Sequence, residues 1–130
     1  MSEVTTIALS RYLKLPVNAD DGFPQAFRLA LGTATYTVEL TVTVVEESWL
    51  ADGRPLVLPL PGAFMVATVT RESPGPAQVV LRRKLVPGLE YQGAELALVA
   101  VSMVVDPRNL GAAGAYGSQV VAGVAARWAL

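Results

Sequence analysis

The side chains most often used for catalysis and metal binding are missing from this sequence. It contains no histidine and no cysteine, which removes the commonest general base, the commonest metal ligand and the thiolate nucleophile. A Ser-His-Asp triad therefore cannot be assembled, and any catalysis would depend on carboxylates or lysine. Disulfide bonds are excluded as well. We expect a protein that is not an enzyme and that uses no cofactor.

Two pairs of adjacent carboxylates are the remaining candidates for acid–base chemistry. They are Asp20-Asp21, in a turn-rich stretch from Asn18 to Gly22, and Glu46-Glu47, at the end of a predicted strand. Neighbouring residues of a strand point to opposite faces, so neither pair is spaced as an acid–base couple. The oxygen atoms of residues 18–22 could contact a hard cation, but the stretch lacks the spacing and the closing glutamate of a calcium loop. We interpret both pairs as solvated turns or strand ends and predict no metal site.

Three glycines, Gly111, Gly114 and Gly117, recur at every third position. The glycines of a dinucleotide-binding fingerprint follow a strand and open a helix. Here the segment is followed by an apparent strand instead. We therefore interpret residues 106–117 as a mobile Gly-rich loop without a cofactor.

Three adjacent cations, Arg82, Arg83 and Lys84, form the most polar run in an apolar chain. On a strand, Arg82 and Lys84 share one face and Arg83 takes the other. Cations on an edge strand protect against aggregation between sheets, and Arg is also favoured in ion-paired contacts with a neighbouring subunit. Trp49 and Trp128 are either plugs of the core or partner contacts. These five residues are the candidate interface.

The composition indicates contacts with other proteins. The chain of 130 residues has 52% hydrophobic and 16% charged residues, against roughly 25% charged residues in typical soluble domains. Little charge is available to cover the surface, so part of that surface is expected to meet protein. The net charge of −1 is too close to neutral to hold the chain on a nucleic-acid backbone.

Two further expectations concern membranes. The N-terminus shows neither a basic leader nor a long apolar segment, so no signal peptide is expected. The longest apolar stretch, residues 96–105, is far short of the ~20 residues of a membrane helix. We expect a soluble protein that is intracellular when it is made.

Alternation of apolar and polar residues with a period of two dominates the chain, as is typical of strands. In residues 35–44 the even positions are Tyr36 and four aliphatic residues, and the odd positions are threonines and one glutamate. Residues 26–45 therefore predict a β-hairpin that turns at Gly32-Thr33. Residues 64–71 and 78–85 predict a second hairpin around Pro74-Gly75-Pro76.

The other segments also favour strands. Ile7, Leu9, Leu13 and Leu15 fall on one face of a predicted strand. Residues 95–105 are apolar on both faces, which is typical of a strand covered on two sides. Residues 119–128 alternate, and Gly123 disfavours a helix. The proline-rich segment 49–61 must be loop or edge.

Together these segments predict one all-β domain that spans residues 1–130. Its architecture is an antiparallel sandwich or partly open barrel of about seven strands, with little or no helix.

Some of these segments also resemble a known family. The stretch "FRLALGTATYTVEL", residues 27–40, is followed by "LVPG" at residues 85–88 and by a turn with Asp106-Pro107 and Leu110-Gly111. These features resemble the phage contractile-tail baseplate plug proteins of the cyanophage type, over about residues 23–124 of this chain. The resemblance implies a non-enzymatic structural subunit of a virion, assembled in the host cytoplasm.

Under this resemblance the partners are other tail proteins and copies of the chain itself, with no small-molecule substrate. Its functional residues would be interface residues, of which Arg82, Arg83 and Lys84 are the first candidates. Two alternatives stay open: a capsid decoration or cement protein, and a small-ligand-binding β-barrel. The barrel would contain a cavity and would gain thermal stability from its ligand.

Overall fold

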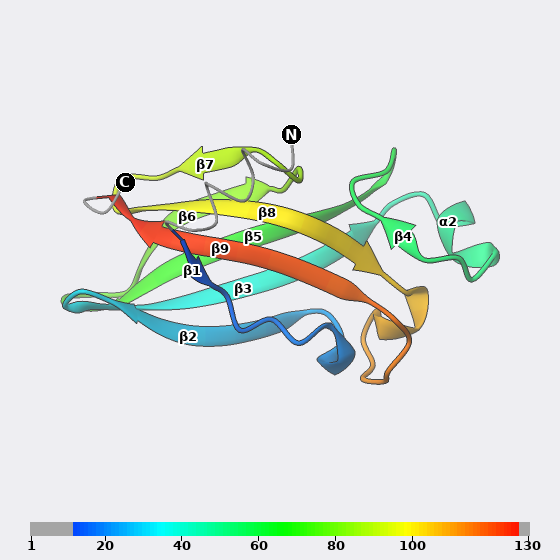
Figure 1. Cartoon of the computed structure of the whole chain (residues 1–130), viewed down its shortest axis with the longest axis horizontal. Helices are drawn as coiled ribbons and strands as arrows, with labels where there is room; N and C mark the ends of the chain where they lie inside the picture. Colours follow the sequence, from blue (N-terminus) through cyan, green and yellow to red (C-terminus); the bar gives the residue numbers. More distant parts are fainter. Residues whose placement is uncertain (1–11, 128–130) are drawn as a thin grey trace.

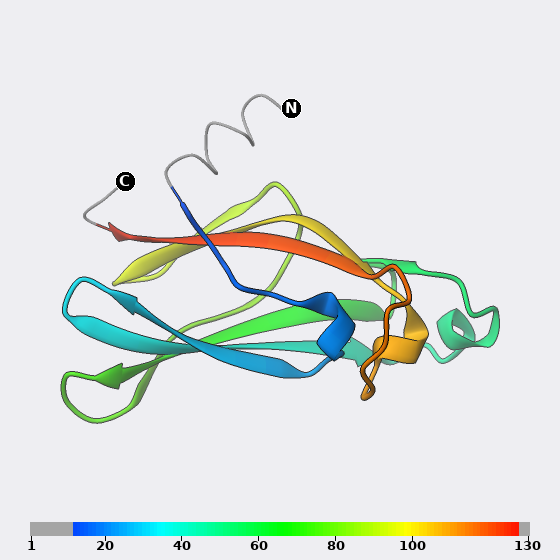
Figure 2. The same ribbon diagram turned by 60° about the horizontal axis from the view of Figure 1, so that its bottom comes forward.

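The structure is a computed structural model that describes residues 12–127. Two antiparallel sheets pack face to face as a sandwich (Figures 1 and 2). One sheet has four strands in the order β2-β3-β5-β6, and the other has the order β1-β9-β8-β4, with β7 also paired to β8. The strands are β1 (Leu13–Lys14), β2 (Gln25–Leu31), β3 (Ala34–Val44), β4 (Leu56–Val57), β5 (Ala63–Ser73), β6 (Gln78–Lys84), β7 (Glu90–Gln92), β8 (Leu96–Val105) and β9 (Gln119–Ala126).

Helical structure within residues 12–127 is confined to one four-residue helix, α2 (Ser48–Ala51), and two 3-10 turns, η1 (Ala19–Asp21) and η2 (Pro107–Asn109). None of these helices is long and apolar enough to cross a membrane. The prediction of an all-β sandwich with little helix is confirmed. The structure has two strands more than the seven predicted, β4 and β7, because segments of two or three residues are too short to show a period.

The four-stranded sheet consists of the two predicted hairpins. β2 pairs with β3 from Gln25↔Leu40 to Leu31↔Ala34, around a turn in which Gly32 has a φ of 61°. β5 pairs with β6, and β3 joins the two hairpins through β5. In β3, Tyr36, Val38 and Leu40 are buried in the core between the sheets, as the alternation predicted, while Val42 and Val44 are partly buried on the same face. In β5 the buried residues also alternate, from Ala63 to Val69.

The five-stranded sheet carries the strand that the sequence predicted to be covered on both faces. Leu96, Leu98 and Ala100 of β8 belong to the main core between the sheets. On the opposite face, Ala97 and Val99 form a second, smaller cluster with two further buried residues, Tyr12 and Ala125. β9 confirms the prediction of a strand after residue 118.

The first strand differs from the prediction in its extent and its buried face. Only Leu13 and Lys14 pair with β9, and Leu13 is 53% exposed although the sequence placed it on the apolar face. Tyr12 is buried instead, because its ring joins the cluster on the outer face of β8 and its hydroxyl bonds to Glu90 of β7. Residues 7–11 of the predicted strand lie outside the described residues.

The proline-rich segment 49–61 is an excursion from the sandwich. It begins within α2, which the sequence did not predict, and then returns as β4 along the edge of β8. The expectation of loop or edge is met by β4. Figures 1 and 2 both show α2 at one extreme end of the molecule.

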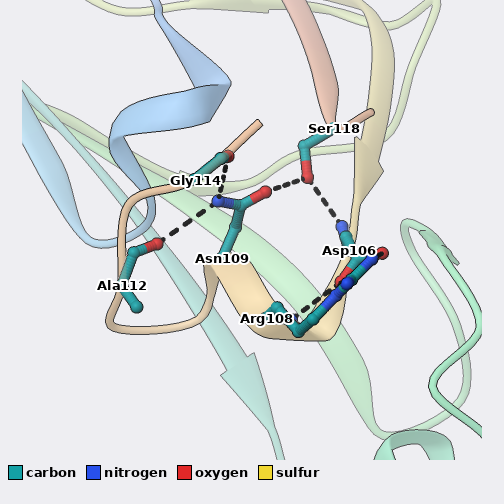
Figure 3. Close-up of polar contacts among 6 residues, drawn as sticks. All are labelled: Asp106, Arg108, Asn109, Ala112, Gly114 and Ser118. Atoms are coloured by element: carbon teal, nitrogen blue, oxygen red, sulfur yellow. Dashed lines mark hydrogen bonds and ion pairs between the residues drawn. The ribbon is translucent and has the colours of Figure 1, made fainter. Parts of the chain in front are cut away.

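A buried asparagine holds the Gly-rich loop through hydrogen bonds (Figure 3). The Asn109 side chain is fully buried, and its Nδ2 donates to the carbonyls of Ala112 at 3.3 Å and Gly114 at 3.0 Å. Its Oδ1 accepts a bond from the Ser118 hydroxyl at 2.6 Å, and that hydroxyl accepts one from the Asp106 amide. The loop is therefore pinned to the beginning of β9.

Two further contacts hold the Gly-rich loop. Hydrogen bonds from the Arg108 side chain and backbone to Asp106 lower the pKa of Asp106 below its usual value. The loop also packs against the turn that contains η1, where Gly22 has a φ of 82°. A Cβ at Gly22 would lie 2.3 Å from the carbonyl oxygen of Ala112, so only glycine fits there without a shift.

Candidate functional site

The three predicted interface cations lie on an edge strand. β6 ends the four-stranded sheet, and Arg82, Arg83 and Lys84 are all exposed. Arg83 shares its side of β6 with buried residues, and its guanidinium carbon lies 5.9 Å from the centre of the Tyr91 ring on the other sheet. The ammonium of Lys84 lies 4.8 Å from the centre of the Phe64 ring.

No carboxylate of the described residues forms an ion pair with any of these cations. Their charge is therefore available to a partner. The edge position also suits the other interpretation, protection against pairing between sheets.

Trp49 packs partly against the core and leaves part of its surface uncovered. It lies on α2, is partly buried against the main core, and donates from Nε1 to the Pro61 carbonyl at 2.6 Å. Its remaining surface lines a hollow of about 150 Å³ together with Val57 and Leu60. Trp128, the other predicted interface tryptophan, lies outside the described residues.

The segment around Trp49 exposes large apolar side chains. Val45 is 69% exposed, Leu50 40% and Val57 62%. We refer to Val45, Trp49, Leu50, Val57 and Leu60 as the apolar tip. Exposed charges of Glu46, Glu47, Asp52 and Arg54 flank it in the sequence. Exposed large apolar side chains among charged ones are a common composition of protein interfaces.

The sequence drew attention to only one of these residues, Trp49. One feature of the sequence could have indicated the others. Leu50 and Val57 lie among prolines and a glycine, and these residues prevent the segment from forming a long strand. Large apolar residues in such a segment are either turned inward or left exposed, and the sequence alone does not distinguish the two.

A second feature occupies the end of the sandwich near the β2–β3 turn. Here Tyr36 of β3 and Arg71 of β5 meet Glu95, which directly precedes β8 of the other sheet. The Tyr36 hydroxyl donates to Glu95 Oε1 at 2.9 Å, and Arg71 Nη1 donates to Glu95 Oε2. Among the ion pairs of residues 12–127, this is the one that joins the two sheets. We refer to these three residues as the ionic clamp.

The clamp is partly shielded from water. Tyr36 is buried, and its burial together with the hydrogen bond to Glu95 raises the pKa of Tyr36 to about 12. Arg71 Nη2 donates to Gln78 Oε1 at 3.0 Å. The third donor, Arg71 Nε, is buried and has no hydrogen-bond partner within the described part of the chain.

A pocket of about 630 Å³ opens beside the clamp. Its volume lies within the roughly 300–1,000 Å³ of small-molecule sites. The polar lining comes from Thr33, Tyr36, Arg71, Glu95 and Arg127, and the apolar lining from Leu31, Ala34, Pro74 and Ala94.

Sequence reasoning did not find this pocket, although one signal was present. Arg71 continues the inward series of β5 after Met65, Ala67 and Val69. A charged residue at an inward position needs a partner, because an unpaired buried charge is costly. The partner, Glu95, comes from the other sheet and cannot be identified from spacing.

The other candidates from the sequence are not brought together. Asp20 and Asp21 are exposed in η1, and Glu46 and Glu47 are exposed after β3. Within residues 12–127 no group of three or more carboxylates could hold a metal ion. The three glycines of the Gly-rich loop have positive φ values and belong to the loop that Asn109 anchors.

Comparison with known proteins gives no relative: no family model matches the chain, and no curated protein or solved structure matches it significantly. The class of protein is therefore described by the fold and its surface features alone. It is a sandwich of two antiparallel sheets, with an apolar tip at α2 and β4 and a pocket beside the ionic clamp.

Proposed function

We propose that the protein is a structural subunit of a phage or phage-like tail baseplate, which acts by packing against other proteins. The observation that carries this proposal is the apolar tip, where Val45, Leu50 and Val57 expose 40–69% of their surface. Covering such side chains in an interface stabilises it by about 1–2 kcal/mol each. Four of its five residues belong to the excursion of residues 49–61, whose helix α2 lies at the extreme end of the sandwich (Figure 2).

The composition supports the same proposal. Only 16% of the residues are charged, which suits a chain whose surface is largely covered after assembly. The baseplate role rests on the resemblance of residues 27–40, 85–88 and 106–111 to the baseplate plug proteins. The partners are other tail proteins and copies of the chain. Arg82, Arg83 and Lys84 provide a second contact for a partner with acidic groups.

The test is the composition of purified particles. The protein should occur at a fixed copy number in isolated tails, and Leu50→Asp should abolish its incorporation because a charge in the centre of an interface costs more than the contact provides. Leu89→Asp is the matched control, since Leu89 is 51% exposed and lies in the β6–β7 connection, away from the tip.

Equal incorporation of both variants would refute the tip as the contact. Presence in isolated capsids and absence from tails would replace the baseplate role with that of a capsid decoration protein. Absence from both would reject a virion role.

A further inference from the structure

The pocket beside the ionic clamp is not needed for packing at the apolar tip, and its chemistry points to a ligand of its own. We propose that this pocket binds a small molecule with an apolar body and a single carboxylate group. The proposal rests on three features of the pocket: its volume, its apolar walls and the balance of charge at its lining. It is independent of the proposed role in assembly.

The pocket is formed by segments that are far apart in the sequence. The β2–β3 turn, the end of β5, the turn before β8 and the residue after β9 all contribute to it. Both sheets therefore hold it in shape, and the ionic clamp fixes their separation at this point. A pocket of about 630 Å³ held by rigid elements is the usual setting for a small ligand.

The walls favour an apolar body. Leu31, Ala34, Pro74 and Ala94 line the pocket without hydrogen-bonding groups on their side chains. A hydrocarbon body that covers these walls is removed from water, which favours binding in proportion to the apolar area buried.

The charges favour an anionic head group. Glu95 is already engaged, because its Oε1 accepts from Tyr36 and its Oε2 from Arg71. Arg127 is exposed at the pocket and donates from Nη1 to the Gly93 carbonyl at 2.7 Å. Its guanidinium has no carboxylate within ion-pair distance among residues 12–127. Hydrogen bonds from Tyr12 and Gln92 and, to a smaller extent, the charge of Arg127 lower the pKa of Glu90, but Glu90 lies beyond ion-pair distance of Arg127.

The remaining nitrogens of Arg127 can therefore bind a carboxylate through two parallel hydrogen bonds, the arrangement that a guanidinium favours. An ammonium group is disfavoured, because the charge of Glu95 is already paired with Arg71 and a second cation, Arg127, lines the pocket. The pocket should consequently distinguish ligands of the same body by the charge of their head group.

The experiment uses the full chain and three probes with the same eight-carbon body: octanoate, octylammonium and 1-octanol. Binding is measured by isothermal titration calorimetry and by ligand-observed NMR. We expect octanoate to bind best. Arg127→Gln should weaken octanoate binding about tenfold or more, to the level of 1-octanol, because one charged contact is lost. Arg28→Gln is the matched control, since Arg28 is exposed on β2 and is not part of the pocket.

A second variant tests the location. Ala94→Phe places a ring in the pocket from an exposed position, and it should abolish binding of all three probes while leaving the circular dichroism spectrum unchanged. The proposal is overturned if octylammonium binds as tightly as octanoate, if octanoate survives Ala94→Phe, or if no probe binds at millimolar concentration. None of these results depends on the apolar tip, so Leu50→Asp should bind octanoate like the wild type.

Discussion

Replacement of Glu95 by alanine should be among the most destabilising single changes at the end of the sandwich that carries the pocket. The Tyr36 hydroxyl is buried and would lose its acceptor, which costs about 1–3 kcal/mol. The side chains of Arg71 and Glu95 are 22% and 27% exposed, so their pair lies between the exposed and the fully buried cases and contributes about 1–2 kcal/mol. The sum is a loss of about 2–5 kcal/mol, or roughly 10–20 °C in Tm for a domain of this size.

Urea unfolding with linear extrapolation measures this loss directly. Glu39→Ala is the control, because Glu39 is exposed on the outer face of β3 and its removal should change the free energy of unfolding by less than about 0.5 kcal/mol. Tyr36→Phe supplies a sharper test. In the Glu95→Ala background it removes a buried hydroxyl without a partner, so the double variant should be more stable than Glu95→Ala alone.

Two results would refute this reasoning about the clamp. One is a Glu95→Ala protein that unfolds at the same urea concentration as Glu39→Ala. The other is a double variant whose loss of unfolding free energy equals the sum of the losses in Glu95→Ala and in Tyr36→Phe. That result would mean that the Tyr36 hydroxyl does not depend on Glu95.

The remaining predictions concern pH and the Gly-rich loop. The pKa of Tyr36 is about 12 in the folded protein and about 10 in an unfolded chain, so the unfolded state loses this proton at a lower pH. The free energy of unfolding, measured in urea, should therefore keep the contribution of Tyr36 below pH 10 and fall between pH 10 and 12. The fall should be smaller in Tyr36→Phe, and a fall of the same size in this variant would contradict the raised pKa. Asn109→Asp places a carboxylate where two carbonyls need a donor and should cost about 3 kcal/mol or more in thermal or urea unfolding, whereas a loss under 1 kcal/mol would show that the network does not anchor the loop. Gly22→Ala and Gly75→Ala both place alanine at a φ near 80°, but a Cβ has open space at Gly75 and meets the Ala112 carbonyl at Gly22; Gly22→Ala should therefore lower Tm clearly more, and equal shifts would contradict the close approach.

The strands could be predicted where one face is wet and the other is buried. In β3 the alternation of Tyr36, Val38 and Leu40 with threonines defines the strand and its inner face, because burial on one face leaves a period of two. The first strand shows where this reasoning fails. Tyr12 is buried and Leu13 is exposed, since the place of Tyr12 depends on a cluster with β8 and β9 that no local pattern reveals.

The sites were harder to predict than the strands. The apolar tip depends on whether Leu50 and Val57 turn inward, which is decided by how α2 and β4 leave the sandwich. The pocket depends on a pair, Arg71 and Glu95, that comes from two different sheets. Contacts of this kind are set by the packing of the sheets and have no fixed spacing in the sequence.

The central claim, that the chain is built to pack against other subunits through the apolar tip, is tested most directly by sedimentation velocity at rising protein concentration. The wild-type chain and Leu89→Asp should associate reversibly between the micromolar and the millimolar range, and Leu50→Asp should remain monomeric throughout. A wild-type chain that stays monomeric at the highest concentration, or a Leu50→Asp variant that associates like the wild type, would contradict the account.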